Sequence, residues 1–152
     1  MSRVGLIGCG RWGGLVLRDL RALGADVVVV DPTGVDGALA HLSELPAVDG
    51  VVVASPATTH AEVVGALLER DVPIFCEKPF TTDVAAARDL VARGGDRIHL
   101  MHLWRYHRGV EALGALARDG GLGEVHGVRS TRVNGPSPPS RASAPRASTP
   151  RW

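Results

Sequence analysis

The feature that most constrains the fold is a glycine-rich turn, G-x-G-x-x-G, at residues 8–13. A short apolar run at residues 3–7 comes directly before the turn, and a predicted helix follows at residues 12–23. In such a turn the first glycine allows a tight reversal, the second lets a pyrophosphate approach the backbone, and the third lets helix and strand pack closely. The helix start presents free N–H groups and a partial positive charge to phosphates. The predicted dinucleotide site in this turn consists of Gly8, Gly10, Arg11, Trp12 and Gly13.

An acidic residue stands where a dinucleotide site needs one. Asp31 follows a predicted strand at residues 25–30, about 20 residues after the turn. Its carboxylate is placed to accept hydrogen bonds from the adenosine ribose hydroxyls, and its charge would repel the 2′-phosphate of NADP. The next residue is Pro32 rather than a phosphate-pairing arginine, so NAD is the predicted cofactor. The residues leave one alternative open, a plain tight turn in which Asp31 is only a turn-forming acid.

Short β-branched runs alternate with longer helical patterns along the chain. This alternation predicts an α/β fold, a doubly wound parallel sheet of the Rossmann type with helices on both faces. The predicted strands are residues 3–7, 25–30, 51–54, 73–76, 97–101 and 124–133. The predicted helices are residues 12–23, a weak one at 35–45, and 58–69, 83–92 and 109–118.

The composition is that of an ordinary globular protein, with 45% hydrophobic residues, 22% charged residues and a net charge of +1. No basic excess points to nucleic acid or to a membrane surface, and no apolar run approaches the ~20 residues that span a bilayer. The two cysteines, Cys9 and Cys76, are too few for a disulfide framework and are predicted to be packing residues. We therefore expect a soluble cytoplasmic protein, and we predict no metal site.

One domain is predicted at residues 1–134, because a chain of this length has room for one core. The character of the sequence changes after Asn134. Residues 135–152 contain five prolines, four serines and three arginines without an acidic residue, so we expect a disordered tail. Its arginines are interpreted as an unselected basic tail rather than a site for nucleic acid or acidic lipid.

A second motif, Glu77-Lys78-Pro79, follows the fourth predicted strand. In a doubly wound sheet, ligands lie at the carboxyl ends of the strands. A lysine beside a cationic nicotinamide ring can exchange a proton with a substrate hydroxyl while hydride leaves the same carbon. The alternative is an ordinary surface ion pair between Glu77 and Lys78.

Three segments together resemble the glucose–fructose oxidoreductase / inositol dehydrogenase family of NAD(P)-dependent oxidoreductases, over residues 3–134. They are the glycine turn, Ala54-Ser55-Pro56 with His60, and Cys76-Glu77-Lys78-Pro79-Phe80. The resemblance implies that Lys78 contacts the substrate hydroxyl in catalysis and that Glu77 lies near the nicotinamide. It also implies that Ser55, Pro56 and His60 line the cofactor, although His60 is equally well explained as a satisfied residue in the first turn of a helix. The implied substrate is a sugar or polyol.

Two further segments, residues 102–107 and 122–125, resemble family members that oxidise nucleotide-linked sugars, although Arg108 stands where those members often have proline. Family members are roughly twice as long as this chain, and their second half forms much of the sugar pocket and the oligomer interface. It also supplies a histidine in a D-x-x-x-H-like motif. The composition after Asn134 motivates a frameshift or fragment hypothesis. Under it the chain is a non-catalytic NAD-binding fragment or a cofactor-sensing module, and self-association is expected.

Overall fold

The computed structural model describes residues 1–131, which divide into two units with a boundary after His102. The strands are β1 (Arg3–Ile7), β2 (Asp26–Val30), β3 (Gly50–Val53), β4 (Ile74–Cys76) and β5 (Ile98–Leu100). The α-helices are α1 (Arg11–Ala22), α2 (His60–Leu67), α3 (Val84–Gly94) and α4 (Arg108–Arg118). The short 3₁₀ helices are η1 (Leu42–Glu44), η2 (Ala57–Thr59), η3 (Leu68–Arg70), η4 (Gly95–Arg97) and η5 (Leu103–Tyr106).

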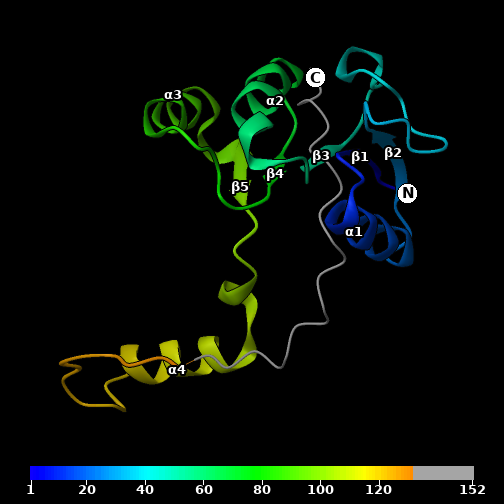
Figure 1. Cartoon of the computed structure of the whole chain (residues 1–152). Coiled ribbons are helices and arrows are strands. Elements are labelled where there is room, and N and C mark those ends of the chain that lie inside the picture. The colour runs from blue at the N-terminus through cyan, green and yellow to red at the C-terminus, as the bar shows by residue number, and fades with distance from the viewer. Residues whose placement is uncertain (132–152) are drawn as a thin grey trace, which may run out of the picture. The chain divides into compact units, whose positions relative to one another are not determined.

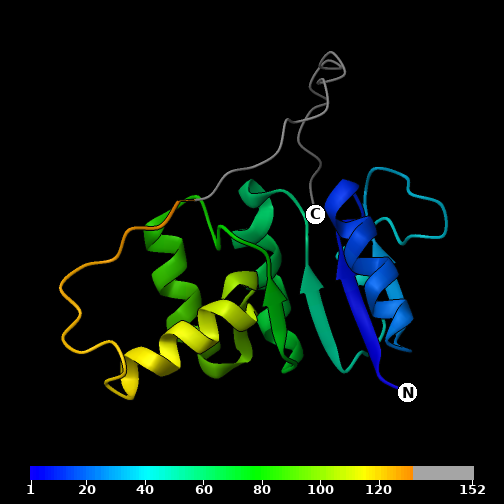
Figure 2. The ribbon, with the colours of Figure 1, turned by 90° about the horizontal axis from the view of Figure 1, so that it is seen from below.

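The first unit is a parallel five-stranded sheet in the order β2-β1-β3-β4-β5. Helix α1 covers one face of the sheet, and α2 and α3 cover the other (Figure 1). The chain runs outward from β1 to β2 and then returns to β3 on the other side of β1, as the turned view also shows (Figure 2). The strand order thus reverses between β1 and β3, and ligands of doubly wound sheets lie at that point. The predicted doubly wound Rossmann fold is confirmed.

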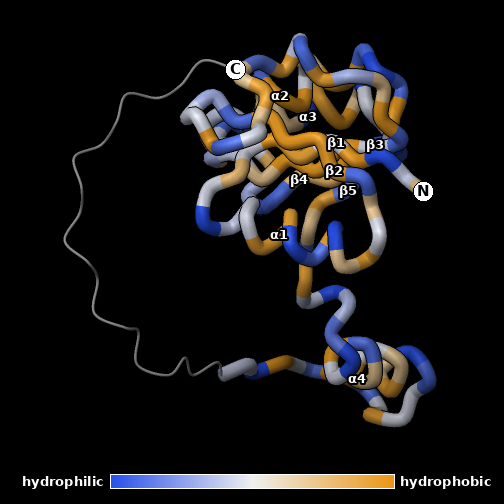
Figure 3. Tube along the Cα trace, turned by 90° about the vertical axis from the view of Figure 1, so that its right-hand side faces the viewer, coloured by the Kyte–Doolittle hydropathy of each residue, from blue (hydrophilic) through white to orange (hydrophobic). Residues whose placement is uncertain are grey.

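Alternation of side chains along the strands divides the core between the two faces of the sheet. Ile7, Val30 and Val53 belong to the larger cluster, which includes buried side chains of α2 and α3. Leu6 and Val52 point the other way and pack with partly buried side chains of α1. The central strands are therefore predominantly hydrophobic (Figure 3), as expected for a sheet covered on both faces.

The register of the sheet brings the strand ends level. Ile7 pairs with both Val30 and Val53, and Val53 pairs with Cys76. The residues that follow these strand ends are consequently placed in a row along one edge of the sheet. That row consists of Gly8, Asp31, Ala54 and Glu77, so the register collects the motifs found in the sequence.

One predicted helix is wrong. Residues 35–45 contain turns, the short helix η1 and an isolated parallel bridge between Leu39 and Val30. Gly37 has φ +72°, a conformation that leaves the helical region, and the Leu39 amide donates to the carbonyl oxygen of Val29 rather than within a helix. The segment therefore extends the edge of the sheet.

In the second unit the described residues, 103–131, hold η5 and α4, which confirms the predicted helix at 109–118. A ring nitrogen of His107 accepts a hydrogen bond from the Gly109 amide at 3.2 Å and caps α4. Residues 124–131 form no strand, so the predicted strand at 124–133 is wrong over its described part. The backbone N–H and C=O groups of a strand need a neighbouring strand to pair with, and residues 103–131 contain no strand. Residues 132–133 and the predicted tail at 135–152 lie outside the described residues.

Candidate functional site

The three glycines of the turn differ in what surrounds them. Gly8 has φ +90°, and a Cβ atom built there would lie 2.6 Å from the backbone of Ser55. A Cβ atom on Gly13 would lie 2.1 Å from the carbonyl oxygen of Gly8, so α1 packs directly against the turn. A Cβ atom on Gly10 would meet nothing within 4 Å. The turn is thus closed at its two outer glycines and open at Gly10, where a pyrophosphate needs access to the backbone.

Helix α1 begins immediately after Gly10, and no side chain caps its first amides. Its first turn contains no acidic residue. The unpaired N–H groups at a helix start carry partial positive charge and bind anions. Arg11 is the first residue of the helix and is exposed, which adds a cation at the same end. The residues present fit the pyrophosphate of a dinucleotide.

Asp31 ties the turn to the end of β2. Its Oδ2 atom accepts a hydrogen bond from the Cys9 amide at 2.6 Å, and its Oδ1 atom accepts from the amide and hydroxyl of Thr33. Burial by itself raises the pKa of Asp31, but the hydrogen bonds from the Thr33 hydroxyl and from the amides of Cys9 and Thr33 outweigh it and hold the pKa below its ordinary value. Asp31 is therefore a carboxylate at neutral pH, as an acceptor for ribose hydroxyls must be. Thr33 was not predicted from the sequence, although a threonine two residues after an Asp acceptor has the usual spacing of such turns.

Glu77 joins the two motifs found in the sequence. The Trp12 indole Nε1 atom donates to Oε1 of Glu77 at 2.7 Å, and the Lys78 amide donates to Oε2 at 3.0 Å. Glu77 as a whole is only 6% exposed. The side chain of Lys78 is exposed at the carboxyl end of β4. The glycine turn and the Glu77–Pro79 segment are 65 residues apart in sequence but are joined by one hydrogen bond.

The loop after β3 lies against the loop after β4 through His60. The two ring nitrogens of His60 lie 2.9 Å from the carbonyl oxygens of Pro79 and Ser55. The ring is buried, and both of its polar atoms are used inside the protein. Any contribution of His60 to cofactor contact is therefore made through the backbone that it holds, and its assignment as a cofactor residue stays a prediction.

Ser55 and Pro56 belong to a small hydroxyl network at the start of η2. The Thr59 hydroxyl donates to the Pro56 carbonyl oxygen at 2.8 Å. Its proton is then used, so the Ser55 hydroxyl donates to Thr59 Oγ1, also at 2.8 Å. Ser55 is buried, and its backbone lies against Gly8. Thr59 was not singled out in the sequence.

The two cysteines are free thiols with little reactivity. Burial, with a smaller contribution from the charge of Glu77, raises the pKa of Cys76 to about 12. Burial and the negative charge of Asp31 also raise the pKa of Cys9. Both thiols are protonated at neutral pH, and the thiolate is the nucleophilic form.

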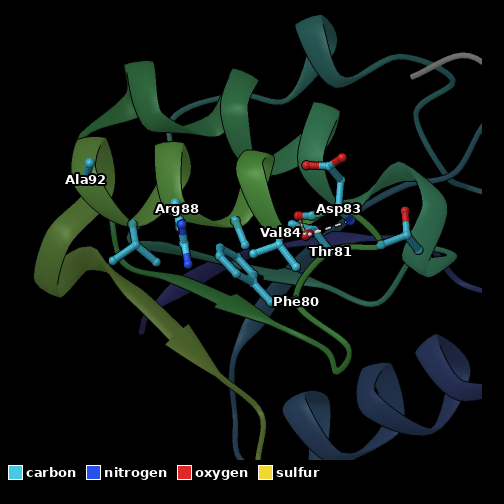
Figure 4. Close-up of a pocket in the computed structure, with 9 residues that line it drawn as sticks. Phe80, Thr81, Asp83, Val84, Arg88 and Ala92 are labelled. Carbon is cyan, nitrogen blue, oxygen red and sulfur yellow. Dashed lines mark hydrogen bonds between the residues drawn. The ribbon is translucent and has the colours of Figure 1, made fainter.

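A surface groove of about 520 Å³ lies beside α3. Figure 4 shows Phe80, Val84 and Arg88 among the side chains that line it. Asp83 caps α3 by accepting a hydrogen bond from the Ala86 amide at 2.7 Å. None of the predicted cofactor residues lines this groove.

The described residues contain neither a metal-binding cluster nor a membrane-spanning helix. Within residues 1–131 no cluster of three or more His, Cys, Asp or Glu side chains is arranged to hold a metal ion. None of the helices in that range combines the length and the apolar character needed to cross a bilayer.

Comparison with known proteins agrees with this geometry. The sequence model of the Gfo/Idh/MocA oxidoreductase family, described as "Oxidoreductase family, NAD-binding Rossmann fold", matches residues 25–96. Inositol 2-dehydrogenase 1 from Paenarthrobacter aurescens is 37% identical over 144 residues, which cover 81% of this chain and 43% of that protein. Residues 25–96 thus match the NAD-binding Rossmann domain of this oxidoreductase family. The family resemblance predicted from the sequence is confirmed.

Solved structures of similar fold include sugar and polyol dehydrogenases. The myo-inositol dehydrogenase from Lactobacillus casei in complex with NAD(H) and myo-inositol has a TM-score of 0.70 and 28% identity, covering 79% of this chain and 42% of that one. A UDP-N-acetylglucosamine 3-dehydrogenase from Acidithiobacillus ferrooxidans has a TM-score of 0.69 and 26% identity, covering 80% and 42%. The chain thus spans less than half the length of the Gfo/Idh/MocA proteins that it matches.

Lys78 has a distinctive place in this chain. Of the 17 lysine and arginine residues in the chain, it is the only lysine. An arginine cannot give up its proton in a protein, whereas a lysine amine can. Among the lysine and arginine residues of the chain, the one able to exchange a proton thus stands at the carboxyl end of β4.

Proposed function

We propose that the chain binds NAD(H) across the carboxyl ends of β1 to β4 and supplies the acid–base lysine of a polyol or sugar dehydrogenase. The single observation that carries this function is the hydrogen bond from Trp12 to Glu77. It joins the turn that would hold the dinucleotide to the segment that holds Lys78. A cofactor turn and a proton-transfer group must lie together in an enzyme that moves hydride and proton from the same hydroxyl-bearing carbon.

The pyrophosphate would lie over Gly10 and the first amides of α1, with Arg11 beside it. The open space at Gly10 and the uncapped helix start support this position. Asp31 would accept a ribose hydroxyl. Its two oxygens receive three hydrogen bonds inside the protein, and a carboxylate has about four acceptor sites.

NAD(H) is preferred over NADP(H) in this proposal. The hydrogen bonds at Asp31 lower its pKa and so maintain a negative charge where a 2′-phosphate would lie. Pro32 follows, where an arginine would otherwise be able to pair with that phosphate. The residue next in sequence therefore supplies no cation to offset the repulsion.

Lys78 would handle the proton of the substrate hydroxyl. Bound NAD⁺ supplies the hydride acceptor. The neutral amine of Lys78 takes the hydroxyl proton as the carbon–hydrogen bonding pair leaves the same carbon, which leaves a ketone and an ammonium group. The ammonium then returns its proton to water. Glu77 fixes the backbone of Lys78 and does not take part in proton transfer.

The substrate class follows from the relatives. Their names specify inositol in one group and a UDP-linked amino sugar in another, and both offer a ring carbon that bears a secondary hydroxyl. We take myo-inositol as the first candidate, because the inositol dehydrogenase is 37% identical to this chain.

The test is NADH formation, followed at 340 nm, with the full chain, NAD⁺ and myo-inositol, and then with UDP-N-acetylglucosamine. Lys78→Arg keeps the positive charge but removes the exchangeable proton, so turnover should fall by roughly 10²–10⁴-fold. Lys78→Met serves as the uncharged comparison. Turnover that survives in Lys78→Arg would contradict the assigned role of Lys78.

Binding of NADH without turnover of either substrate would overturn the enzymatic part and leave a narrower function. The chain would then be a cofactor-binding module that needs only the glycine turn and Asp31. Thermal unfolding with and without NADH separates this outcome from failure to bind, since a ligand at 100 times its Kd stabilises a protein by about 2.7 kcal/mol.

A further inference from the structure

The carboxylate of Glu77 is shared between two donors from different parts of the chain. One oxygen accepts from the indole of Trp12 at 2.7 Å, and the other accepts from the amide of Lys78 at 3.0 Å. Both donors are N–H groups that cannot accept in return, and they meet two different oxygens. A carboxylate satisfies both at once, whereas an amide in the same place would turn its NH₂ group toward one of them. Glu77 is 6% exposed, which shields these bonds from competition by water.

Trp12 occupies a variable position of the glycine turn and the first turn of α1. Its ring is half exposed, so the residue is not explained by burial of its apolar surface alone. The indole nitrogen is its only polar atom, and it is directed at Glu77. A smaller apolar residue could pack at this position, but it would leave one oxygen of a buried carboxylate without a donor.

The residue after Lys78 is held from the other side. The His60 ring lies between the carbonyl oxygens of Pro79 and Ser55. The backbone of Lys78 is therefore fixed at the preceding residue through Trp12 and at the following residue through His60, while its side chain stays exposed. Such an arrangement restrains the base of a lysine side chain without touching its amine.

We propose that Trp12 is a positioning residue for Lys78, acting through the Glu77 carboxylate, so that the cofactor turn and the proton-transfer residue keep one geometry. This role rests on the function proposed for Lys78. It assigns to the indole N–H a contribution that is separate from any contact of Trp12 with the dinucleotide.

The first test needs no cofactor. Amide hydrogen exchange is measured by NMR on the full chain and on Trp12→Phe, which keeps an aromatic ring and removes the donor. Exchange at the Lys78 amide should become roughly tenfold faster. The charge-assisted hydrogen bond from Trp12 restrains the Glu77 carboxylate, which is the acceptor of the Lys78 amide, and Trp12→Phe removes that bond. The amides of Gly8 and Ala54, which donate to strand carbonyls at 2.9 and 2.8 Å, are the internal controls and should not change.

A double-mutant cycle distinguishes positioning from simple loss of packing. Glu77→Gln keeps the size of the side chain, but its single oxygen can take the place of only one of the two carboxylate oxygens, and its NH₂ group faces the other donor. If the two residues act through one bond, Trp12→Phe combined with Glu77→Gln accelerates exchange at Lys78 no more than the stronger single variant does. Independent effects that multiply in the double variant would overturn the proposal. If circular dichroism shows that Trp12→Phe does not fold, the same cycle is measured with Trp12→Tyr in its place, combined with Glu77→Gln.

The second test observes the Lys78 amine. Because the chain has one lysine, an amine reagent labels Lys78 and the N-terminal amine, and the two are resolved by peptide mass spectrometry. Each variant is labelled at ten times its own Kd for NADH. NADH should slow labelling of Lys78 in the wild type roughly tenfold more than in Trp12→Phe. Trp104→Phe removes an indole N–H in the other unit and is the matched control.

Equal protection of Lys78 in the wild type and in Trp12→Phe, with unchanged amide exchange, would overturn the positioning role while leaving cofactor binding intact. Failure of the wild type to bind NADH would instead contradict the proposed function. The exchange cycle still decides whether Trp12 restrains Lys78 in that case.

Discussion

The backbone amide of Cys9 lies 2.6 Å from a carboxylate oxygen of Asp31, so the second position of the glycine turn is bonded to the end of β2. Asp31 is thus structural in the free protein as well as a candidate for ribose contact. We expect Asp31→Asn to lower the free energy of unfolding by about 1–3 kcal/mol, because the amide cannot accept from all three donors. Urea denaturation checks this value. A change below a few tenths of a kcal/mol would show that the bond contributes nothing.

The pKa of Asp31 predicts the pH range in which this stabilisation is lost. Because the folded pKa is lowered, the contribution is fully present above the unfolded value of about 3.9 and disappears as the pH falls through the folded value. The difference in urea midpoint between wild type and Asp31→Asn should therefore be constant from pH 7 to 5 and shrink below pH 4. A difference that grows on acidification would contradict the direction of the shift.

Much of this site follows from sequence because it consists of strand ends. The register of parallel strands brings Gly8, Asp31 and Glu77 to one edge once the strands are identified. The hydrogen bonds that join them depend on rotamers and loop paths, which periodicity does not specify. The bonds of Trp12 to Glu77 and of Thr33 to Asp31 were accordingly not foreseen. The segment at 35–45 was misread because its apolar residues serve a sheet edge, which resembles a weak helix in sequence.

The glycine turn predicts opposite outcomes for two similar substitutions. Gly13→Ala places a methyl group against the Gly8 carbonyl and should destabilise the fold by more than about 2 kcal/mol, because backbone must move. Gly10→Ala meets open space and should change stability by less than about 1 kcal/mol, yet weaken NADH binding by obstructing the pyrophosphate. Thermal unfolding and NADH titration of both variants measure these effects. Normal NADH affinity in Gly10→Ala would place the cofactor elsewhere.

The two thiols should resist modification. Because burial raises the pKa of Cys76 to about 12 and also raises that of Cys9, few thiolates exist at pH 7. Reaction with Ellman's reagent should be slow for Cys9 and slower still for Cys76 in the folded chain, and complete for both in urea. Cys9→Ala and Cys76→Ala assign the two phases. Rapid reaction of Cys76 under native conditions would contradict its burial.

Binding of NADH to the glycine turn is the central claim, and titration of the full chain with NADH and NADPH tests it most directly. Energy transfer to the reduced nicotinamide from tryptophan, of which the chain has three including Trp12, should show saturable binding of one NADH per chain. NADPH should bind at least about tenfold more weakly because of the charge on Asp31, and Gly10→Ala should abolish most of the NADH signal. Absence of saturable NADH binding, or equal affinity for NADPH, would contradict this account of the site.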